Sequence, residues 1–420
     1  MSISGTPGKG KVTLVIIIEM LMVCLFGITL NVVSPIITSI NAQTGWSLGQ
    51  IGQFNSIVFF LMGAGAFIGS PLMDRFGTKP TAIIALALAA VGHLAAFVAG
   101  ENYIMHWIGR FLYGCGWGIF FLVPGSVITY WVSAEKRATI QGLRCTCDFA
   151  SGGVAYYIVM PIFSGLNENW QATIGVFGIL FAIVLAAYIF GVSTNEAERE
   201  EMDAKRLARA QAKAEGKKAA SSGLVRAAKN RQVWIITLSL IGAQWIFNSF
   251  TTYLPAFFEI ERGFSAENAS QITGMASFFG IASGLLGGAL SSAIGRRKIL
   301  TWPSLAVMVF GAVSCLFVEG MFMSCLCSGL IGFGFTAFMT GYTTIPGELP
   351  GADNDFYAGA VAIIYGIAFI LTYLIPYPYD AMLSAGKSMQ SILLVYAIPG
   401  AVSLIASFFI METGPKAKKA

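Results

Sequence analysis

Twelve long apolar stretches divide this sequence almost from end to end, and they limit its fold more than any other feature. A helix needs about 20 apolar residues to cross the roughly 30 Å hydrocarbon core of a bilayer. Only 11% of the 420 residues are charged, whereas a soluble domain carries about 25%. We therefore expect an all-α membrane protein with twelve transmembrane helices. The expected spans are residues 12–37, 48–70, 81–100, 104–131, 138–163, 171–193, 232–258, 270–293, 299–318, 321–346, 357–379 and 389–411.

The distribution of Lys and Arg over the expected loops predicts the orientation of the spans. With the N-terminus in the cytoplasm, 22 of the 26 basic residues fall in cytoplasmic segments, and the outer loops hold only Arg262 and Lys387. Basic loops favour the cytoplasmic side. The first apolar run is too long for a signal-peptide core, so we expect a retained helix. The sequence thus predicts a multi-pass protein of the cytoplasmic (inner) membrane with both termini in the cytoplasm.

A polar segment near the middle separates two groups of six spans. It is acidic from Asn195 to Asp203 and then basic from Lys205 as far as Gly216. This order is expected of a solvated helix whose dipole is complemented at both ends. We expect an N-terminal six-helix bundle over residues 1–193, a cytoplasmic linker with a solvated helix over 194–231, and a C-terminal six-helix bundle over 232–420.

The two groups of spans repeat one another at a nearly constant spacing along the chain. Gly114 and Gly116 in the fourth span match Gly332 and Gly334 in the tenth, and the segment after the second span is similar to the segment after the eighth. Asn31 in the first span has Asn248 in the seventh as its counterpart. A repeat that covers half of the chain indicates two pseudo-symmetric six-helix bundles.

The repeated segment carries a family motif, Gly-x-Leu-x-Asp-Arg-x-Gly-Arg-Lys. The sequence departs from it at Ser70 and Thr78, and the second copy has Ser292 in place of the acid. The first copy keeps Leu72, Asp74, Arg75, Gly77 and Lys79, and the second keeps Gly288, Leu290, Gly295 and Arg296. With Arg110-x-x-x-Gly114 in the fourth span, the chain resembles the major facilitator superfamily over essentially its whole length. Trp131-x-x-x-Glu135-Lys136-Arg137 resembles the organic-anion and oxalate–formate branches of that superfamily.

The resemblance implies a carrier in which two bundles rock about a central site, with the motif loops as gating loops. In the first loop, Asp74 is expected to face the N-terminal end of a neighbouring helix, and Arg75 to pair with acids of another. A simpler interpretation is that Arg75 and Lys79 only set the orientation of the spans. The expected gating residues are Asp74, Arg75, Gly77, Lys79, Gly295 and Arg296.

Four ionisable residues lie within the expected spans, and all are in the first half: Glu19, Arg110, Arg144 and Asp148. A charge in the middle of a membrane helix is costly and needs a partner or a wet cavity. The estimated depths favour two pairs, Glu19 with Arg144 and Arg110 with Asp148. Three interpretations remain. Asp148 or Glu19 carries a proton, Arg110 or Arg144 binds an anionic substrate, or the four residues form static ion pairs.

The second half offers uncharged groups instead. Gln244 and Asn248 are one helical turn apart, and we expect them to share a cavity with Asn31. Tyr253, Tyr342 and Tyr365 suit a wall that is both apolar and hydrogen-bonding, although each is also compatible with plain packing. Tyr377 and Tyr379 are expected in the interface belt. The glycine runs at Gly63 and Gly284 are expected between the halves as sliding surfaces.

Other classes of function find little support in the sequence. The cysteines lie in apolar stretches, and with only His93 and His106 we expect neither a metal site nor a cofactor. No nucleotide-binding loop or catalytic set is present, so the chain is not expected to be a pump or an enzyme. The net charge of +5 comes from loops beside an anionic membrane, and no nucleic-acid partner is expected.

We therefore expect a secondary active transporter working by alternating access. Its partners are a small solute, for which an organic anion such as a carboxylate is a candidate, and protons or a counter-substrate. We expect a monomer in the bilayer. One alternative is an efflux carrier for amphiphilic compounds and drugs, with Glu19 and Asp148 attracting cations. An alternative of another class, a membrane sensor that transports nothing, would need a larger soluble domain than the linker offers.

Overall fold

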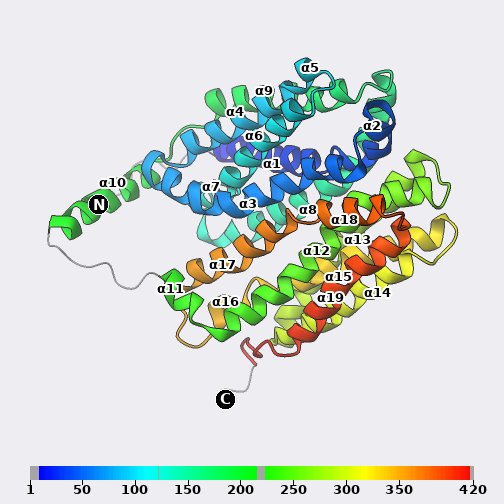
Figure 1. Cartoon of the computed structure of the whole chain (residues 1–420). Helices are drawn as coiled ribbons and strands as arrows, with labels where there is room; N and C mark the ends of the chain where they lie inside the picture. Colours follow the sequence, from blue (N-terminus) through cyan, green and yellow to red (C-terminus); the bar gives the residue numbers. More distant parts are fainter. Residues whose placement is uncertain (1–8, 122, 215–222, 417–420) are drawn as a thin grey trace.

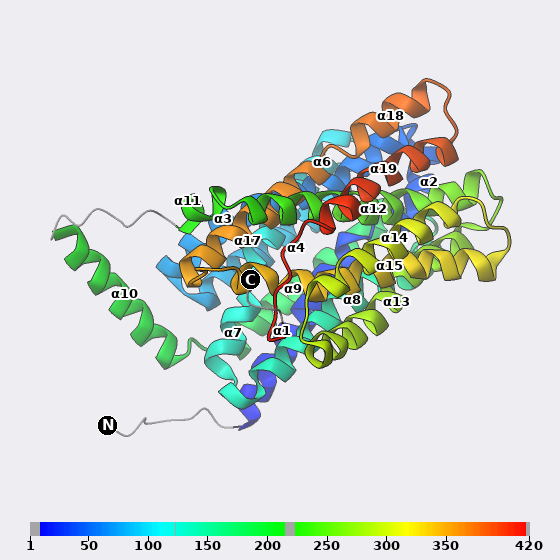
Figure 2. The same ribbon diagram turned by 90° about the horizontal axis from the view of Figure 1, so that it is seen from below.

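The computed structural model describes residues 9–121, 123–214 and 223–416, and the chain folds into two helical bundles that lie side by side (Figures 1 and 2). The first bundle is coloured blue to green in Figure 1. Its helices are α1 (Lys9–Leu30), η1 (Ser34–Ile36), α2 (Ile37–Thr44), α3 (Leu48–Phe76), α4 (Thr78–Leu94), α5 (Ala96–Ala99), α6 (Tyr103–Phe120), α7 (Val123–Trp131), α8 (Ala134–Gly165) and α9 (Trp170–Gly191).

Two helices of the linker, α10 (Glu196–Ala214) and α11 (Gly223–Ala228), connect the bundles, and α10 projects from the body of the molecule (Figure 1). The second bundle is coloured green to red. Its helices are α12 (Arg231–Ile260), α13 (Ala266–Ile294), η2 (Lys298–Leu300), α14 (Trp302–Cys315), α15 (Met321–Tyr342), α16 (Ile345–Glu348), α17 (Asn354–Thr372), α18 (Pro376–Ser384) and α19 (Met389–Ser407).

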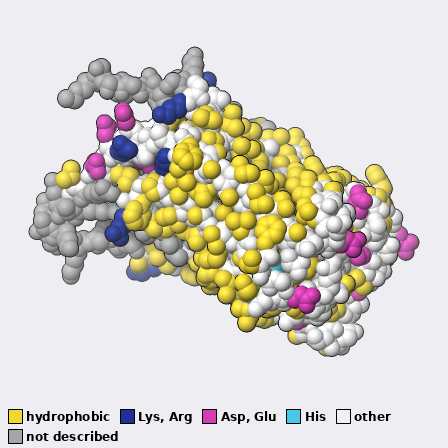
Figure 3. Space-filling view, turned by 90° about the horizontal axis from the view of Figure 1, so that it is seen from above, with side chains coloured by type: hydrophobic (Ala, Val, Ile, Leu, Met, Phe, Trp, Pro, Cys, Tyr) yellow, Lys and Arg dark blue, Asp and Glu magenta, His cyan; other side chains and the backbone are white. Residues whose placement is uncertain are grey.

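The described chain contains ten helical segments that are long and apolar enough to cross a membrane. The 29-residue α3 and the 32-residue α8 complete the expected twelve by their length and place in the bundle. In Figure 3 apolar side chains cover the middle of the visible face, and Lys and Arg lie toward the end from which α10 projects. An apolar belt between two polar ends is what a membrane-spanning protein requires.

The first membrane span is longer than predicted and is broken. It was expected over residues 12–37, but it continues to Thr44 and is interrupted between Leu30 and Ile37. Pro35 contributes to the interruption because it has no backbone N–H to donate. The helices α3 and α8 also extend beyond the expected 48–70 and 138–163, since charged residues can continue a helix outside the bilayer.

Close helix contacts reproduce the sequence repeat. A Cβ atom placed on Gly114 would lie 3.1 Å from Val58 Cα, and one placed on Gly332 would lie 2.7 Å from Ala276 Cα. Val58 and Ala276 are separated along the chain by the same spacing as the two glycines. Each glycine thus lets the fourth helix of its half approach the second at the same place. The predicted fold class, with two pseudo-symmetric bundles, is confirmed.

The two ends of the molecule differ in how the halves meet. We call the end beside α10 and α11 the linker end and the opposite one the far end. Among the described residues, the hydrogen bonds between the halves lie toward the far end. These bonds are Thr38–Glu259, Ser47–Asp380, Tyr156–Thr251, Ser270–Tyr156 and Tyr157–Gln271. In this structure the halves are joined at the far end.

Candidate transport site and gating loops

Arg110 on α6 is engaged by several neighbouring acceptors. Its side chain is only 4% exposed, and it donates to Phe54 O at 2.8 Å and to Asn55 Oδ1 at 3.2 Å. It also donates to Thr29 O at 2.9 Å and Leu30 O at 3.1 Å, at the C-terminal end of α1. These carbonyls lie where α1 breaks and lack partners within the helix. The negative end of the helix dipole stabilises the guanidinium there.

Glu19 on α1 is completely buried. One carboxyl oxygen, Oε1, accepts a hydrogen bond of 2.8 Å from the hydroxyl of Tyr188 on α9. The other oxygen, Oε2, has no hydrogen-bond partner among the described residues. A buried carboxyl group that leaves one oxygen open needs a proton, a water molecule or a change of conformation to satisfy it.

Arg144 and Asp148 lie one turn apart on α8, beside α1. The two helices approach so closely that a Cβ atom placed on Gly27 would lie 3.1 Å from Asp148 O. Arg144 is partly exposed and makes no hydrogen bond or ion pair with another described residue, and its Nε is buried without a partner. Its guanidinium carbon lies 5.7 Å from the ring centre of Phe121. The charge of Arg144 acts electrostatically on both Glu19 and Asp148.

The predicted pairing of Arg110 with Asp148 is wrong. Arg110 points toward the break in α1 and donates to four acceptors there, and no ion pair within 4.0 Å joins it to Asp148. The predicted pairing of Glu19 with Arg144 is present only as an electrostatic interaction, because no ion pair within 4.0 Å joins them either. The predicted static ion pairs are therefore absent from these four described residues.

No hydrogen bond joins Asn31 to Gln244 or Asn248 in the part of the chain that the structure describes, and their shared cavity stays a prediction. Asn31 donates to Gly152 O at 3.4 Å within the first half. Asn248 donates to Gln244 Oε1 at 2.9 Å and to Gln244 O at 2.8 Å, along its own helix. The Asn248 amide N–H groups thus bond within α12, and Asn31 lies at the α1 break against α8.

The candidate tyrosines have three different surroundings. Tyr342 is buried and donates to Ile236 O, which joins α15 to α12. Tyr365 on α17 is half-buried between the rings of Tyr342 and Phe369. Tyr253 on α12 is buried and stacks on Tyr379, with ring centres 3.7 Å apart and an interplanar angle of 4°. The placement of Tyr379 in the interface belt is therefore wrong, because its ring is covered by the far-end contact.

The first gating loop is held by the linker helix. Gly77 has a φ of +86°, which favours glycine, and α4 begins directly after it. The buried carboxylate of Glu198 on α10 accepts from Thr78 N at 2.5 Å and from Thr78 Oγ1 at 2.8 Å. Lys79 donates to Ile189 O at 2.8 Å. An acid therefore does face a helix N-terminus here, but it is Glu198.

Arg75 and Asp74 are the other predicted gating residues of that loop. Arg75 is exposed, with its guanidinium carbon 5.2 Å from the ring centre of Phe76. The side chain of Asp74 lies outside those that the structure describes, so its predicted contact stays a prediction.

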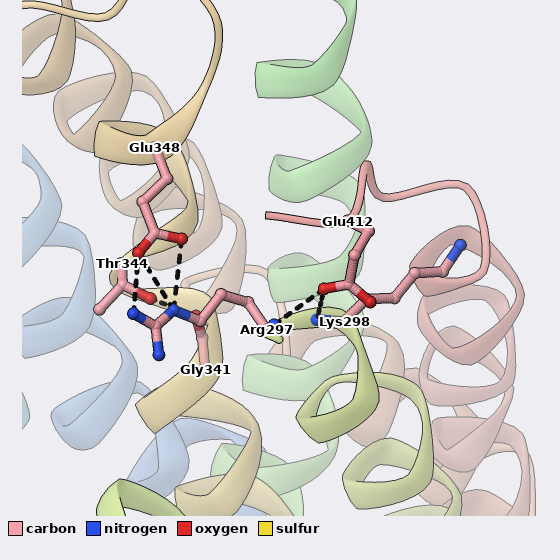
Figure 4. A network of polar contacts seen from close by, with 6 residues as sticks. All are labelled: Arg297, Lys298, Gly341, Thr344, Glu348 and Glu412. Carbon is pink, nitrogen blue, oxygen red and sulfur yellow. Dashed lines mark hydrogen bonds and ion pairs between the residues drawn. The ribbon is translucent and has the colours of Figure 1, made fainter. Parts of the chain in front are cut away.

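A carboxylate caps the second gating loop in the same way (Figure 4). Gly295 has a φ of +68° and Arg296 is exposed. Glu412, from the segment after α19, accepts from Arg297 N at 2.8 Å and from Lys298 N at 3.0 Å. The side chain of Arg297 pairs with Glu348 of α16 at 2.8 Å. In both halves, an acidic residue after the sixth span thus accepts hydrogen bonds from backbone N–H groups at the start of the third span.

Several of these residues were not predicted from the sequence. Glu198 and Glu412 lie shortly after the sixth and twelfth spans, so their similar position in the two halves was an available signal. The pairing of Tyr188 with Glu19 had no comparable signal, because the two residues are 169 positions apart on different helices.

The two glycine runs also differ from one another. A Cβ atom placed on Gly63 would lie 2.9 Å from Gly366 O, across the two halves, as expected, whereas one placed on Gly65 of the same run would lie 2.4 Å from Gly118 Cα, within the first half. One placed on Gly284 would instead meet Thr336 at 3.1 Å, within the second half. The prediction for Gly284 is therefore wrong.

Comparisons with known proteins agree with this architecture. Residues 20–373 match the family model described as Major Facilitator Superfamily. A probable sulfoacetate transporter of Cupriavidus necator is 22% identical over 271 residues, which cover 64% of this chain and 62% of that protein. The match thus spans less than two thirds of that relative. A probable galactarate/D-glucarate transporter of Bacillus subtilis is 22% identical over 377 residues, covering 84% and 80%.

A solved structure shares the fold at low sequence identity. A crystal structure of a D-xylose-proton symporter superimposes with a TM-score of 0.71 at 18% identity and covers 97% of this chain and 98% of its own. The family match extends through both bundles and their shared motif loops. The chain therefore belongs to the Major Facilitator Superfamily.

Proposed function

We propose that this protein transports a small organic anion, with a carboxylate or sulfonate group bound by Arg144. The observation that carries the proposal is the difference between the two membrane-embedded arginines. Arg110 has four protein acceptors, whereas Arg144 makes no hydrogen bond or ion pair with a described residue, and its Nε is buried without an acceptor. An unpaired guanidinium inside a membrane bundle is costly, and a bidentate anion satisfies it. The relatives named above carry the names of anionic substrates.

We further propose that Glu19 and Asp148 couple transport to protons. Glu19 is buried with one oxygen open, and Asp148 lies one turn from the proposed substrate ligand. Protonation of one of these carboxyls removes a negative charge beside Arg144 and changes its interaction with an anionic substrate. Exchange against a second anion is the alternative form of coupling.

The proposed function also implies a domain organisation, an oligomeric state and an orientation in the membrane. We propose bundles over residues 1–193 and 232–420 joined by the linker 194–231, a monomer in the cytoplasmic (inner) membrane, and a linker end that faces the cytoplasm. The excess of Lys and Arg in the linker-end segments supports this orientation. With that orientation, the structure corresponds to a state closed toward the outside.

The first experiment identifies the substrate class with purified protein. Thermal unfolding is measured with mono- and dicarboxylates, a sulfonate, neutral sugars and an amphiphilic cation, because a bound ligand raises the midpoint. Each hit is then tested for uptake into proteoliposomes with an imposed pH gradient. Stabilisation by carboxylates or sulfonates supports the proposal. A response to amphiphilic cations alone favours the efflux alternative, and binding without transport favours the sensor.

The second experiment tests Arg144 itself. We expect Arg144→Gln to lower kcat/KM for the anion by at least about 100-fold, because a charge-assisted bidentate contact is lost. Arg144→Lys keeps the charge but loses the fork and should retain part of the activity. Lys229→Gln, an exposed linker-end change, is the matched control. Normal transport by Arg144→Gln contradicts the substrate role, and pH-driven uptake that survives in both Asp148→Asn and Glu19→Gln contradicts the coupling role.

A further inference from the structure

The far-end contact between the halves contains a close fit of two glycines against two larger side chains. Gly49 and Gly52 lie one turn apart on α3 of the first half. A Cβ atom placed on Gly52 would lie 2.2 Å from Tyr253 Oη and 2.9 Å from Tyr253 Cζ. One placed on Gly49 would lie 2.5 Å from Asp380 Cβ and 2.6 Å from Asp380 Cγ. Only glycine leaves room for the opposite half at both positions.

We propose that Gly49 and Gly52 form a notch that receives Asp380 and Tyr253, and that this notch is the reversible far-end seal of the transport cycle. The proposal assigns Tyr253 to gating rather than to substrate binding. It holds for any substrate, so it can fail or succeed independently of the anion proposal.

Neighbouring hydrogen bonds align the notch. Ser47 Oγ donates to Asp380 Oδ2 at 2.8 Å, just before the start of α3. Thr38 Oγ1 on α2 donates to Glu259 Oε2 at 2.6 Å. Both bonds join a hydroxyl of the first half to a carboxylate of the second. They fix the register of α3 against α12 and α18, so the two glycines meet their partners.

The partner side chains cannot move aside easily. Tyr253 is 0% exposed, and its ring is held flat against Tyr379. A tyrosine ring turns about only two side-chain bonds, so it must leave this stack to make room for a methyl group. The contact at Gly49 involves the Cβ atom of Asp380, which moves only with the backbone of α18. An added methyl group therefore has to push the halves apart.

The same contact contains groups that favour reopening. The hydroxyls of Tyr253 and Tyr379 are buried without a hydrogen-bond partner among the described residues. A buried hydroxyl without a partner regains hydrogen bonds when water reaches it. A small cavity next to the notch is lined by Gly52, Ser56, Asn248, Thr252 and Tyr253 among others, and it offers water a polar place to enter. Close packing closes the seal, and hydration of the tyrosines opposes it.

The test measures the distance across the far end in full-length protein. Spin labels are attached to cysteines introduced at the exposed Ala42 and Lys387, in a variant without the seven native cysteines. Wild-type protein should show a population with a short distance. Gly52→Ala should lose this population and transport at least tenfold more slowly. Gly165→Ala is the control, because a Cβ atom there meets nothing within 4 Å.

A second substitution makes the test specific. Gly52→Ala combined with Tyr253→Ala should regain the short distance, because the clashing ring is gone. Gly49→Ala should not be rescued by Tyr253→Ala, since its clash is with Asp380. Thermal unfolding of each variant shows that it is folded. An unchanged distance distribution in Gly52→Ala, or no rescue by Tyr253→Ala in folded protein, overturns the proposal. If Gly52→Ala does not fold, the comparison of Gly49→Ala with its Tyr253→Ala double variant decides.

Discussion

The two halves of this protein share a scaffold but use equivalent positions differently. Arg110 and Ser328 are separated by the repeat spacing and occupy the same place on the fourth span of each half. Arg110 donates four hydrogen bonds to α1 and α3, whereas Ser328 donates one, of 3.4 Å, to Thr273 O on α13. The first half has a broken first span to stabilise, and α12, its counterpart, is continuous. The half whose first span is broken is thus also the half that has a buried arginine at this position.

The caps of the two motif loops show the converse, a role that both halves share. Glu198 and Glu412 both accept from backbone N–H groups at the start of a third span. Glu198 lies on the linker helix α10, whereas Glu412 lies in the irregular chain after α19, as Figure 4 shows. Duplicated halves can therefore meet one physical requirement, the satisfaction of helix N-terminal N–H groups, with acids that follow their sixth span in different secondary structure.

The largest change in the free energy of unfolding is expected when Arg110 and its counterpart Ser328 are each substituted. Arg110→Gln replaces the charged guanidinium by a shorter neutral amide and loses the charge-assisted bonds to the Thr29 and Leu30 carbonyls, each worth about 1.5–3 kcal/mol, so unfolding should become easier by roughly 3 kcal/mol or more. Ser328→Ala removes one long bond and should cost about 1 kcal/mol or less. Denaturant unfolding in one detergent compares them. A stable Arg110→Gln protein that has lost transport would instead place Arg110 in the transport chemistry.

An intermediate, local change in amide exchange is expected when either capping acid, Glu198 or Glu412, is removed. Glu198→Ala should raise amide exchange at Thr78 about tenfold and speed trypsin cleavage within α10, because the helix loses two charge-assisted bonds. Glu412→Ala should raise exchange at Arg297 and Lys298 and leave α10 unchanged. Each variant is the control for the other. Equal exposure of both loops in either variant would mean that the caps are not independent.

The smallest change in amide exchange is expected at the ion pair that attaches α11 to the second half. Arg226 donates to Asp353 at 2.5 Å, and this bond lowers the pKa of Asp353 from its ordinary 3.8. A lowered pKa means that the ion pair stabilises the folded state above this ordinary value and is lost as pH falls through the lowered one. Amide exchange over residues 223–228 should therefore stay constant from pH 7 to 5, after correction for the intrinsic rate, and rise only below about pH 4.

Added salt should distinguish the exposed ion pair of α11 from the buried contact of α10. The side chains of Arg226 and Asp353 are 39% and 55% exposed, whereas Glu198 is 3% exposed. Screening acts on exposed pairs, so about 0.5 M NaCl should loosen α11 slightly and leave α10 in place. Loosening of α10 with no change in α11 would contradict this assignment of the two contacts.

The fold of this protein could be predicted from its sequence alone. Twelve apolar stretches, their basic loops and the regular spacing of the repeat act along the chain, and each can be recognised without knowing which helices touch. The four charges within the spans could be located in the same way. The length of the first span was misjudged, because polar residues continued a helix that hydrophobicity alone would end.

What each of those charges does depends on the tertiary structure. Arg110 and Arg144 look equivalent in the sequence, but Arg110 donates to the carbonyls at the end of α1, whereas Arg144 on α8 makes no hydrogen bond or ion pair with a described residue. Likewise, Tyr379 has the composition of an interface residue, but Tyr253 covers its ring. Partners are set by the packing of residues far apart in the chain, and helix periodicity carries no information about which neighbour a side chain will meet.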